Sequence, residues 1–158
     1  MDQLTDKLWL GNASAARNIT LLKKNGITKV LSVMNNPPHT YKESDGVNLK
    51  YINIYDKPRE NIVQYFGECI EFIEGKENVL VHCIFGKSRS ATIVTAYLIW
   101  KKRISLDDAL NFVNQKRKMA VPNTGFKKQL QIFEELLKTN NYNLNKIDFK
   151  KIEWDYKS

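Results

Sequence analysis

The residues best suited to chemistry lie in one short segment, residues 82–90, which reads His-Cys-Ile-Phe-Gly-Lys-Ser-Arg-Ser. It follows a short apolar run, residues 79–81, and precedes a stretch that is apolar nearly all round. The segment should therefore join a buried strand to a central helix. At such a junction successive backbone N–H groups can point into one concavity, and the helix N-terminus adds a positive field. The sequence predicts an anion-binding loop here.

Three residue types in this segment complement one another. Gly86 lets the backbone bend closely around an anion. Arg89, six residues after the cysteine, can donate two parallel hydrogen bonds to two phosphate oxygens. Cys83 in such a cradle should be a thiolate at neutral pH, which is the nucleophilic form of cysteine. The competing interpretation is a core cysteine beside a surface arginine, and the spacing of cysteine, glycine and arginine argues against it.

The pattern His-Cys-x-x-Gly-x-x-Arg-Ser resembles the signature of the cysteine-dependent protein tyrosine phosphatase superfamily. Its surroundings resemble the small, atypical dual-specificity branch of that superfamily. The similarity extends to Leu8-Trp9-Leu10-Gly11 near the start of the chain and to Pro122-Asn123 near its end, so it covers roughly residues 4–138. The resemblance implies hydrolysis of phosphotyrosine, phosphoserine and phosphothreonine in proteins through a phosphocysteine intermediate, with no cofactor and no metal.

The resemblance also implies individual roles. Cys83 would attack phosphorus, and Ser90 would hydrogen-bond the sulfur and help it to leave. His82 would orient the loop and keep Cys83 acidic. Asn123 would support the loop, cap the last helix, or do both. The phosphate would be held by the Arg89 side chain and by the backbone amides of Ile84, Phe85, Gly86, Lys87, Ser88 and Arg89.

Asp56 matches the place of the family's general acid, in a loop before the helix that precedes the signature strand. A departing alkoxide or phenoxide needs a proton, which a carboxylic acid on a loop can supply. The alternative is a turn or helix-cap aspartate, and Asp45 would then be the next candidate for the acid. One departure from the family is Phe85, where alanine is common. Its ring should alter the rim of the pocket and leave its amide unchanged.

The pattern of elements predicts an α/β domain with a central, mostly parallel sheet flanked by helices. A catalytic domain should occupy residues 1–138, and residues 139–158 should form a polar tail or an added edge element. Strands are expected at residues 8–10, 27–33, 49–54 and 79–81, and helices at residues 12–25, 61–74 and 89–102, followed by two more that begin after Ser105 and Asn123.

Bulk properties limit the location and partners of the protein. The chain has 158 residues, 42% of them hydrophobic and 27% charged, which suits one globular domain. Its longest nearly apolar run, residues 91–100, is about half of a bilayer span. The chain begins without a signal-peptide pattern. We expect a cytoplasmic and possibly also nuclear monomer that acts on phosphorylated protein, without nucleic acid as a partner and without membrane insertion.

Other interpretations remain open. The same catalyst could act on a phosphoinositide or an RNA 5′-phosphate, which Lys87 and the net charge of +8 favour. Ile84 argues against the lipid, because lipid-directed relatives tend to carry lysine there. A non-catalytic phosphate-binding module would typically lack Cys83 or Arg89. A rhodanese-like sulfur carrier would not need Asp56.

The second cysteine, Cys69, shares the apolar face of its predicted helix. Core packing is therefore favoured for it over a redox partnership with Cys83.

Overall fold

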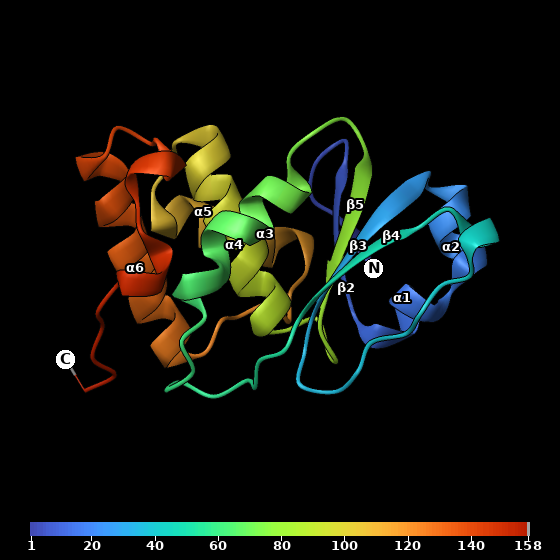
Figure 1. Cartoon of the computed structure of the whole chain (residues 1–158), viewed down its shortest axis with the longest axis horizontal. Coiled ribbons are helices and arrows are strands. Elements are labelled where there is room, and N and C mark those ends of the chain that lie inside the picture. The colour runs from blue at the N-terminus through green and yellow to red at the C-terminus, as the bar shows by residue number, and fades with distance from the viewer. Residues whose placement is uncertain (158) are drawn as a thin grey trace.

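The centre of the computed structural model, which describes residues 1–157, is a five-stranded sheet with helices on both faces (Figure 1). The strand order is β1-β2-β5-β3-β4, and β1 pairs antiparallel with β2 while the other pairs are parallel. The strands are β1 (Asp2–Gln3), β2 (Leu8–Gly11), β3 (Ile27–Val33), β4 (Asn48–Ile52) and β5 (Asn78–His82). The predicted mostly parallel α/β sheet is confirmed, and the short β1 was not predicted.

Two layers of helices cover this sheet. The helices are α1 (Ala13–Arg17), α2 (Ile19–Lys24), α3 (Phe66–Ile73), α4 (Arg89–Lys102), α5 (Leu106–Lys116) and α6 (Thr124–Thr139). The first two lie on one side of the sheet and the other four on the opposite side (Figure 1). Because successive strand residues point to opposite faces, Leu80 packs with the α1–α2 layer, whereas Val79 and Val81 join the larger core.

The single helix predicted for residues 12–25 is wrong, since the chain forms two short helices there. Asn18 ends α1 and begins α2, and its side-chain oxygen accepts a hydrogen bond from the Leu21 amide at 3.0 Å. An asparagine side chain that satisfies a nearby amide competes with continuous helix hydrogen bonding. The helix predicted for residues 61–74 is also shorter, because a 3-10 turn, Val63–Tyr65, precedes α3.

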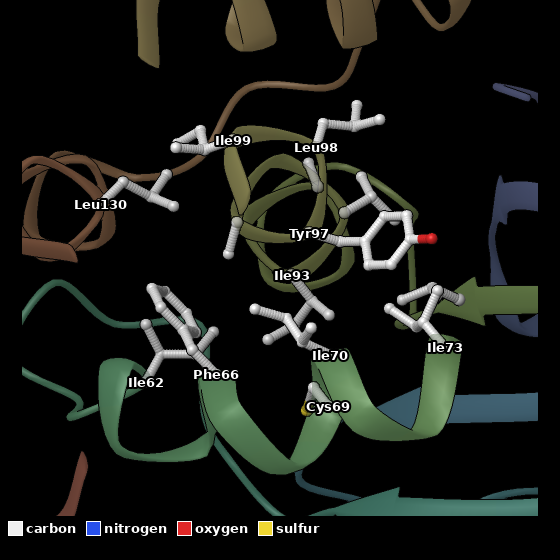
Figure 2. Packing of buried hydrophobic residues seen from close by; sticks show 14 of the residues in the cluster. Ile62, Phe66, Cys69, Ile70, Ile73, Ile93, Tyr97, Leu98, Ile99 and Leu130 are labelled. Atoms are coloured by element: carbon white, nitrogen blue, oxygen red, sulfur yellow. The ribbon is translucent and has the colours of Figure 1, made fainter. Parts of the chain in front are cut away.

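Helix α4 occupies the centre of the helical layer. Every residue from Arg89 to Ile99 is buried, as a helix that is apolar on all sides requires. Figure 2 shows Ile93 and Tyr97 of α4 facing Ile70 and Ile73 of α3. Within residues 1–157, no helix has both the length and the apolar character that crossing a bilayer demands.

Residues 140–157 return along the helical layer after α6. They contain two 3-10 turns, Leu144–Lys146 and Phe149–Lys151. The Phe149 ring lies 5.9 Å from the Phe133 ring and packs over Gly67, where an added Cβ would come within 2.7 Å of it. This segment is therefore packed against the helices. The domain boundary after residue 138 stays a prediction.

Candidate active site

The candidate site lies at the edge of the sheet where the four parallel strands end. In parallel sheets this edge is the usual place for ligands, because the loops that follow the strands meet there. The connection after β3 contains Asn35, the one after β4 reaches Asp56, and the one after β5 begins with Cys83. We call residues 83–89 the phosphate loop and residues 55–60 the acid loop.

The phosphate loop turns sharply at Gly86, which has a φ of 66°. A Cβ at this position would lie 2.6 Å from the backbone oxygen of Gly11. A side chain is therefore excluded by both conformation and space. The amide of Ala13 also donates to the Ile84 carbonyl at 3.1 Å, so the start of α1 supports the loop from one side.

Cys83 and Ser90 lie together at the base of the loop. The Cys83 Sγ is 3.0 Å from the Ser90 Oγ, and both residues are buried. A thiolate carries no proton, so in that state the serine hydroxyl donates to the sulfur. Such a hydrogen bond stabilises negative charge on the sulfur.

The Arg89 side chain is oriented by two acceptors on other strand ends. Its Nη1 donates to the Asn35 Oδ1 and to the Ile54 carbonyl, each at 2.9 Å. Its Nε is buried and has no hydrogen-bond partner among residues 1–157. A buried donor of this kind needs an acceptor. The guanidinium edge that carries Nε is thus available for an oxyanion. Asn35, which orients the other edge, was not predicted from the sequence.

Asn123 connects the acid loop to the phosphate loop. Its Nδ2 donates to the Asp56 Oδ1 at 2.9 Å, and its backbone amide donates to the Ser88 Oγ at 3.0 Å. Its own Oδ1 accepts from the Phe126 amide at 2.8 Å and so caps α6. Asn123 therefore makes the contacts that both of the roles left open by the sequence would need, and the exposed Asp56 lies beside the loop.

The acid loop packs against the first turns of α6. An added Cβ at Gly125 would lie 1.8 Å from the Pro58 carbonyl oxygen, so only glycine permits this approach. The buried Gln129 donates from its Nε2 to the Glu60 carbonyl at 2.8 Å. The Glu60 carboxylate in turn accepts from the Tyr55 amide at 3.1 Å. These contacts fix both ends of the acid loop.

His82 is buried behind the nucleophile. Its Nδ1 lies 3.1 Å from the Cys83 carbonyl oxygen and its Nε2 lies 2.5 Å from the Ser32 Oγ. A carbonyl only accepts, so Nδ1 carries the proton and Nε2 accepts from the serine. Burial lowers the pKa of His82 from its ordinary value to about 4, against the opposing effect of the hydrogen bond to Cys83. The ring is therefore neutral near pH 7 and donates a hydrogen bond to the Cys83 carbonyl.

Arg117 supports the phosphate loop from its outer side, a role that the sequence analysis did not assign. Its Nε donates to the Gly86 carbonyl at 2.8 Å and its Nη2 to the Phe85 carbonyl at 3.0 Å. Its Nη1 pairs with Asp2 at 2.9 Å. The C=O and the N–H of one peptide unit point in opposite directions. Because Arg117 holds these two carbonyl groups outward, the N–H groups of the same peptide units face inward, which favours anion binding by the loop.

Other candidate residues lie outside this site. Cys69 is fully buried among apolar side chains of α3 and α4 (Figure 2), and burial raises its pKa. Core packing is thus its role, as the sequence favoured. The Asp45 carboxylate accepts from the Lys42 amide at 2.8 Å in a surface turn, so Asp45 is a turn residue.

Comparison with known proteins agrees with this geometry. The family model described as "Dual specificity phosphatase, catalytic domain" matches residues 8–136. The chain belongs to the dual specificity phosphatase family. It is a dual-specificity protein phosphatase, a hydrolase of the protein tyrosine phosphatase superfamily.

Relatives of the phosphatase differ in length. Dual specificity protein phosphatase 1 of Arabidopsis thaliana is 40% identical over 140 residues, which are 85% of this chain and 69% of the relative. Human dual specificity protein phosphatase 7 is 40% identical over 139 residues, which are 85% of this chain and 33% of that protein. The chain therefore spans about two thirds of the first relative and one third of the second.

Solved structures share the fold. The crystal structure of DUSP15 aligns with a TM-score of 0.84 and 30% identity, and the alignment covers 97% of each chain. That of human DUSP28 gives 0.82 and 30%, and covers 89% of this chain and 99% of the other.

Proposed function

We propose that this phosphatase hydrolyses phosphotyrosine, phosphoserine and phosphothreonine in proteins with Cys83 as its nucleophile. The observation that carries the proposal is the combination of a buried sulfur and a buried, unpaired arginine donor within one loop. A phosphoryl group brought to that loop would supply the missing acceptor and present phosphorus to the sulfur. We also propose that the protein acts as a monomer, because Asn123 and Ser88 of the same chain already bring the acid loop to the phosphate loop. Its location in the cytoplasm or nucleus stays a prediction.

In the first step the Cys83 thiolate forms a bond to phosphorus while the bond from phosphorus to the substrate oxygen breaks. Arg89 and the loop amides hold the equatorial oxygens, where negative charge is stabilised in the transition state. Asp56 gives its proton to the leaving oxygen. The products are the dephosphorylated side chain and a phosphocysteine.

In the second step water attacks phosphorus and the bond from phosphorus to sulfur breaks. Asp56, now a carboxylate, accepts a proton from the water. Ser90 donates to the departing sulfur, to which it is already within hydrogen-bond distance. Inorganic phosphate leaves, and the thiolate and the protonated Asp56 are restored.

The test is Cys83→Ser assayed on phosphopeptides, phosphoinositide vesicles and RNA 5′-phosphate ends side by side. An alcohol is not ionised at neutral pH, so turnover should be abolished while inorganic phosphate still binds. The wild type should cleave the peptides, retain activity in a metal chelator and lose it with a thiol-alkylating reagent. Ordinary turnover by the serine variant would exclude this mechanism, and exclusive cleavage of lipid or RNA would exclude the substrate.

A further inference from the structure

Exposed apolar side chains gather around the mouth of the candidate site. Among residues 1–157, five large hydrophobic side chains are exposed. Four of them lie in segments that border the phosphate loop, and we call these four the rim: Tyr55, Phe85, Met119 and Val121. The fifth, Tyr51, lies on the edge strand β4. Scattered surface hydrophobic residues are normal, whereas a cluster at one place indicates a binding surface.

Hydrogen bonds fix the rim segments to one another. The Val121 amide donates to the Lys87 carbonyl at 2.8 Å. The segment before Val121 begins at Arg117, which bonds the carbonyls of Phe85 and Gly86. Residues 117–121 therefore run alongside residues 85–87, and this juxtaposition brings Met119 and Val121 to the same border as Phe85.

Tyr55 lies in the acid loop, which meets this border through Asn123. It directly precedes Asp56, which Asn123 connects to Ser88 of the loop. The rim thus combines a residue of the acid loop with residues of the phosphate loop and of the segment that follows α5. Phe85 is 68% exposed in a loop that is otherwise mostly buried, so covering its ring would remove apolar area from water.

A hollow of about 320 Å³ continues the rim beyond Val121. It lies between α5 and the start of α6. Its lining combines four apolar residues with two asparagines and one lysine: Leu110, Asn111, Asn114, Ala120, Val121, Pro122 and Lys127. The apolar residues of this lining could contact a bulky aliphatic or aromatic side chain of the substrate while the phosphoryl group occupies the loop.

We propose that the rim selects phosphoprotein segments that carry a bulky apolar residue within two positions of the phosphorylated one. The proposal rests on the proposed function, since it concerns the substrate of the same site. Exposed lysines stand beside the rim: Lys57, whose Nζ lies 5.3 Å from the centre of the Tyr55 ring, and Lys87 and Lys118. They attract anions generally, so the apolar residues supply the discrimination.

The experiment compares two phosphotyrosine peptides of equal length and charge, with leucine or serine at the two positions on either side. The wild type should prefer the leucine peptide by roughly tenfold in kcat/KM, mainly through KM, since covering part of the rim contributes about one decade of affinity. The double variant Met119→Ser, Val121→Ser should reduce this ratio to below about twofold. Neither side chain belongs to the catalyst, so p-nitrophenyl phosphate should be hydrolysed at the wild-type rate.

The matched control is Tyr51→Ser, which removes an exposed aromatic side chain outside the rim and should keep the preference. Phe85→Ala should also lower the ratio of peptide to p-nitrophenyl phosphate turnover. Equal turnover of the two peptides by the wild type, or a preference that survives the double variant, would overturn the rim proposal and leave the phosphatase function intact. Failure to cleave either peptide, with p-nitrophenyl phosphate or phosphoinositide vesicles still cleaved, would overturn the proposed function and the rim proposal together.

Discussion

At the scale of single residues, the site depends on side chains that use several of their polar atoms at once. Asn123 uses its amide nitrogen, its carbonyl oxygen and its backbone N–H on three different segments. Arg89 uses both hydrogens of Nη1 for orientation and keeps Nε for a ligand. A substitution that keeps the size or the charge of such a residue would therefore still lose some of its hydrogen bonds.

Asn35 should act as a positioning residue for Arg89. Asn35→Ala leaves one Nη1 hydrogen without its acceptor, so the guanidinium loses a fixed direction. Small misplacements of this kind can cost up to about 10²-fold in rate. We expect kcat/KM on phosphopeptides to fall while the unfolding midpoint changes little. Asn35→Asp restores the acceptor oxygen and should recover much of the activity; if it behaves like the alanine variant, Asn35 does not orient Arg89.

Asp56→Asn should slow substrates according to the basicity of their leaving oxygen. A general acid contributes typically about 10²–10⁴ in rate. The alkoxide from phosphothreonine needs the proton most, and the phenoxide from a fluorinated aryl phosphate hardly needs it. The variant should therefore lose most of its phosphothreonine turnover and keep most of its fluoroaryl turnover. Equal losses on both substrates would make Asp56 a structural turn residue.

At the scale of elements, two helices approach other segments closely at a glycine. Gly125 of α6 faces the Pro58 carbonyl in the acid loop, and Gly67 of α3 faces the Phe149 ring in the C-terminal segment. Both positions are helical, so alanine is favourable for the helix itself. Any damage from alanine must therefore come from the contact.

Gly125→Ala should displace the acid loop, since a Cβ 1.8 Å from a carbonyl oxygen cannot be accommodated. Overpacking of this kind typically costs about 1–3 kcal/mol of stability. Turnover of phosphothreonine peptides should fall well below that of the fluoroaryl phosphate, as for Asp56→Asn. Gly67→Ala is the matched control: it should lower the unfolding midpoint and leave the ratio of the two activities unchanged. The same ratio in both variants would show that α6 does not position the acid.

The sequence was sufficient for the elements with strong local patterns and for the chemistry of one contiguous segment. The all-apolar helix α4 and the buried strand β5 lie where periodicity placed them, and the loop between them carries its glycine and arginine at fixed spacing. The break at Asn18 and the short strand β1 depend on a single side-chain hydrogen bond and on a two-residue pairing. Neither leaves a periodic signal.

Partners that are distant in the chain were harder to predict. Asn35 and Arg117 meet the phosphate loop from 54 and 31 residues away, and their neighbours in sequence give no indication of this contact. Asn35 could have been found from the parallel sheet, because residues that follow the parallel strands β3 and β5 lie at the same edge of the sheet. Arg117 lies between two predicted helices, and its contacts with the phosphate loop depend on how the chain folds back.

At the scale of the whole molecule, the stability of the fold should depend on pH through His82. Its folded-state pKa of about 4 lies below the ordinary value near 6.5, so between these values the unfolded chain binds a proton that the folded chain does not. Stability is therefore complete above about pH 6.5 and is lost as the pH falls toward 4, by up to about 3 kcal/mol. Denaturant titrations at several pH values measure this slope.

The matched variant for this slope is His82→Gln, which keeps a donor and an acceptor and does not titrate. Other groups titrate near pH 4 in both proteins, so the informative quantity is the difference in slope between them. The wild type should lose more stability than the variant between pH 6.5 and 4. Parallel curves would show that the imidazole ring becomes protonated without cost inside the folded protein.

Tyr156, near the C-terminus, contacts the acid loop, so a label placed beside it could report on that loop. Its carbonyl accepts from the Lys128 Nζ at 2.5 Å, and Arg59 of the acid loop stacks over its ring with the guanidinium carbon 5.3 Å from the ring centre. Arg59 is three residues from Asp56, so an environment-sensitive fluorophore introduced at position 157 would report displacement of the acid loop. Such a label touches neither nucleophile nor acid, and its emission could follow loop movement during a single turnover in solution.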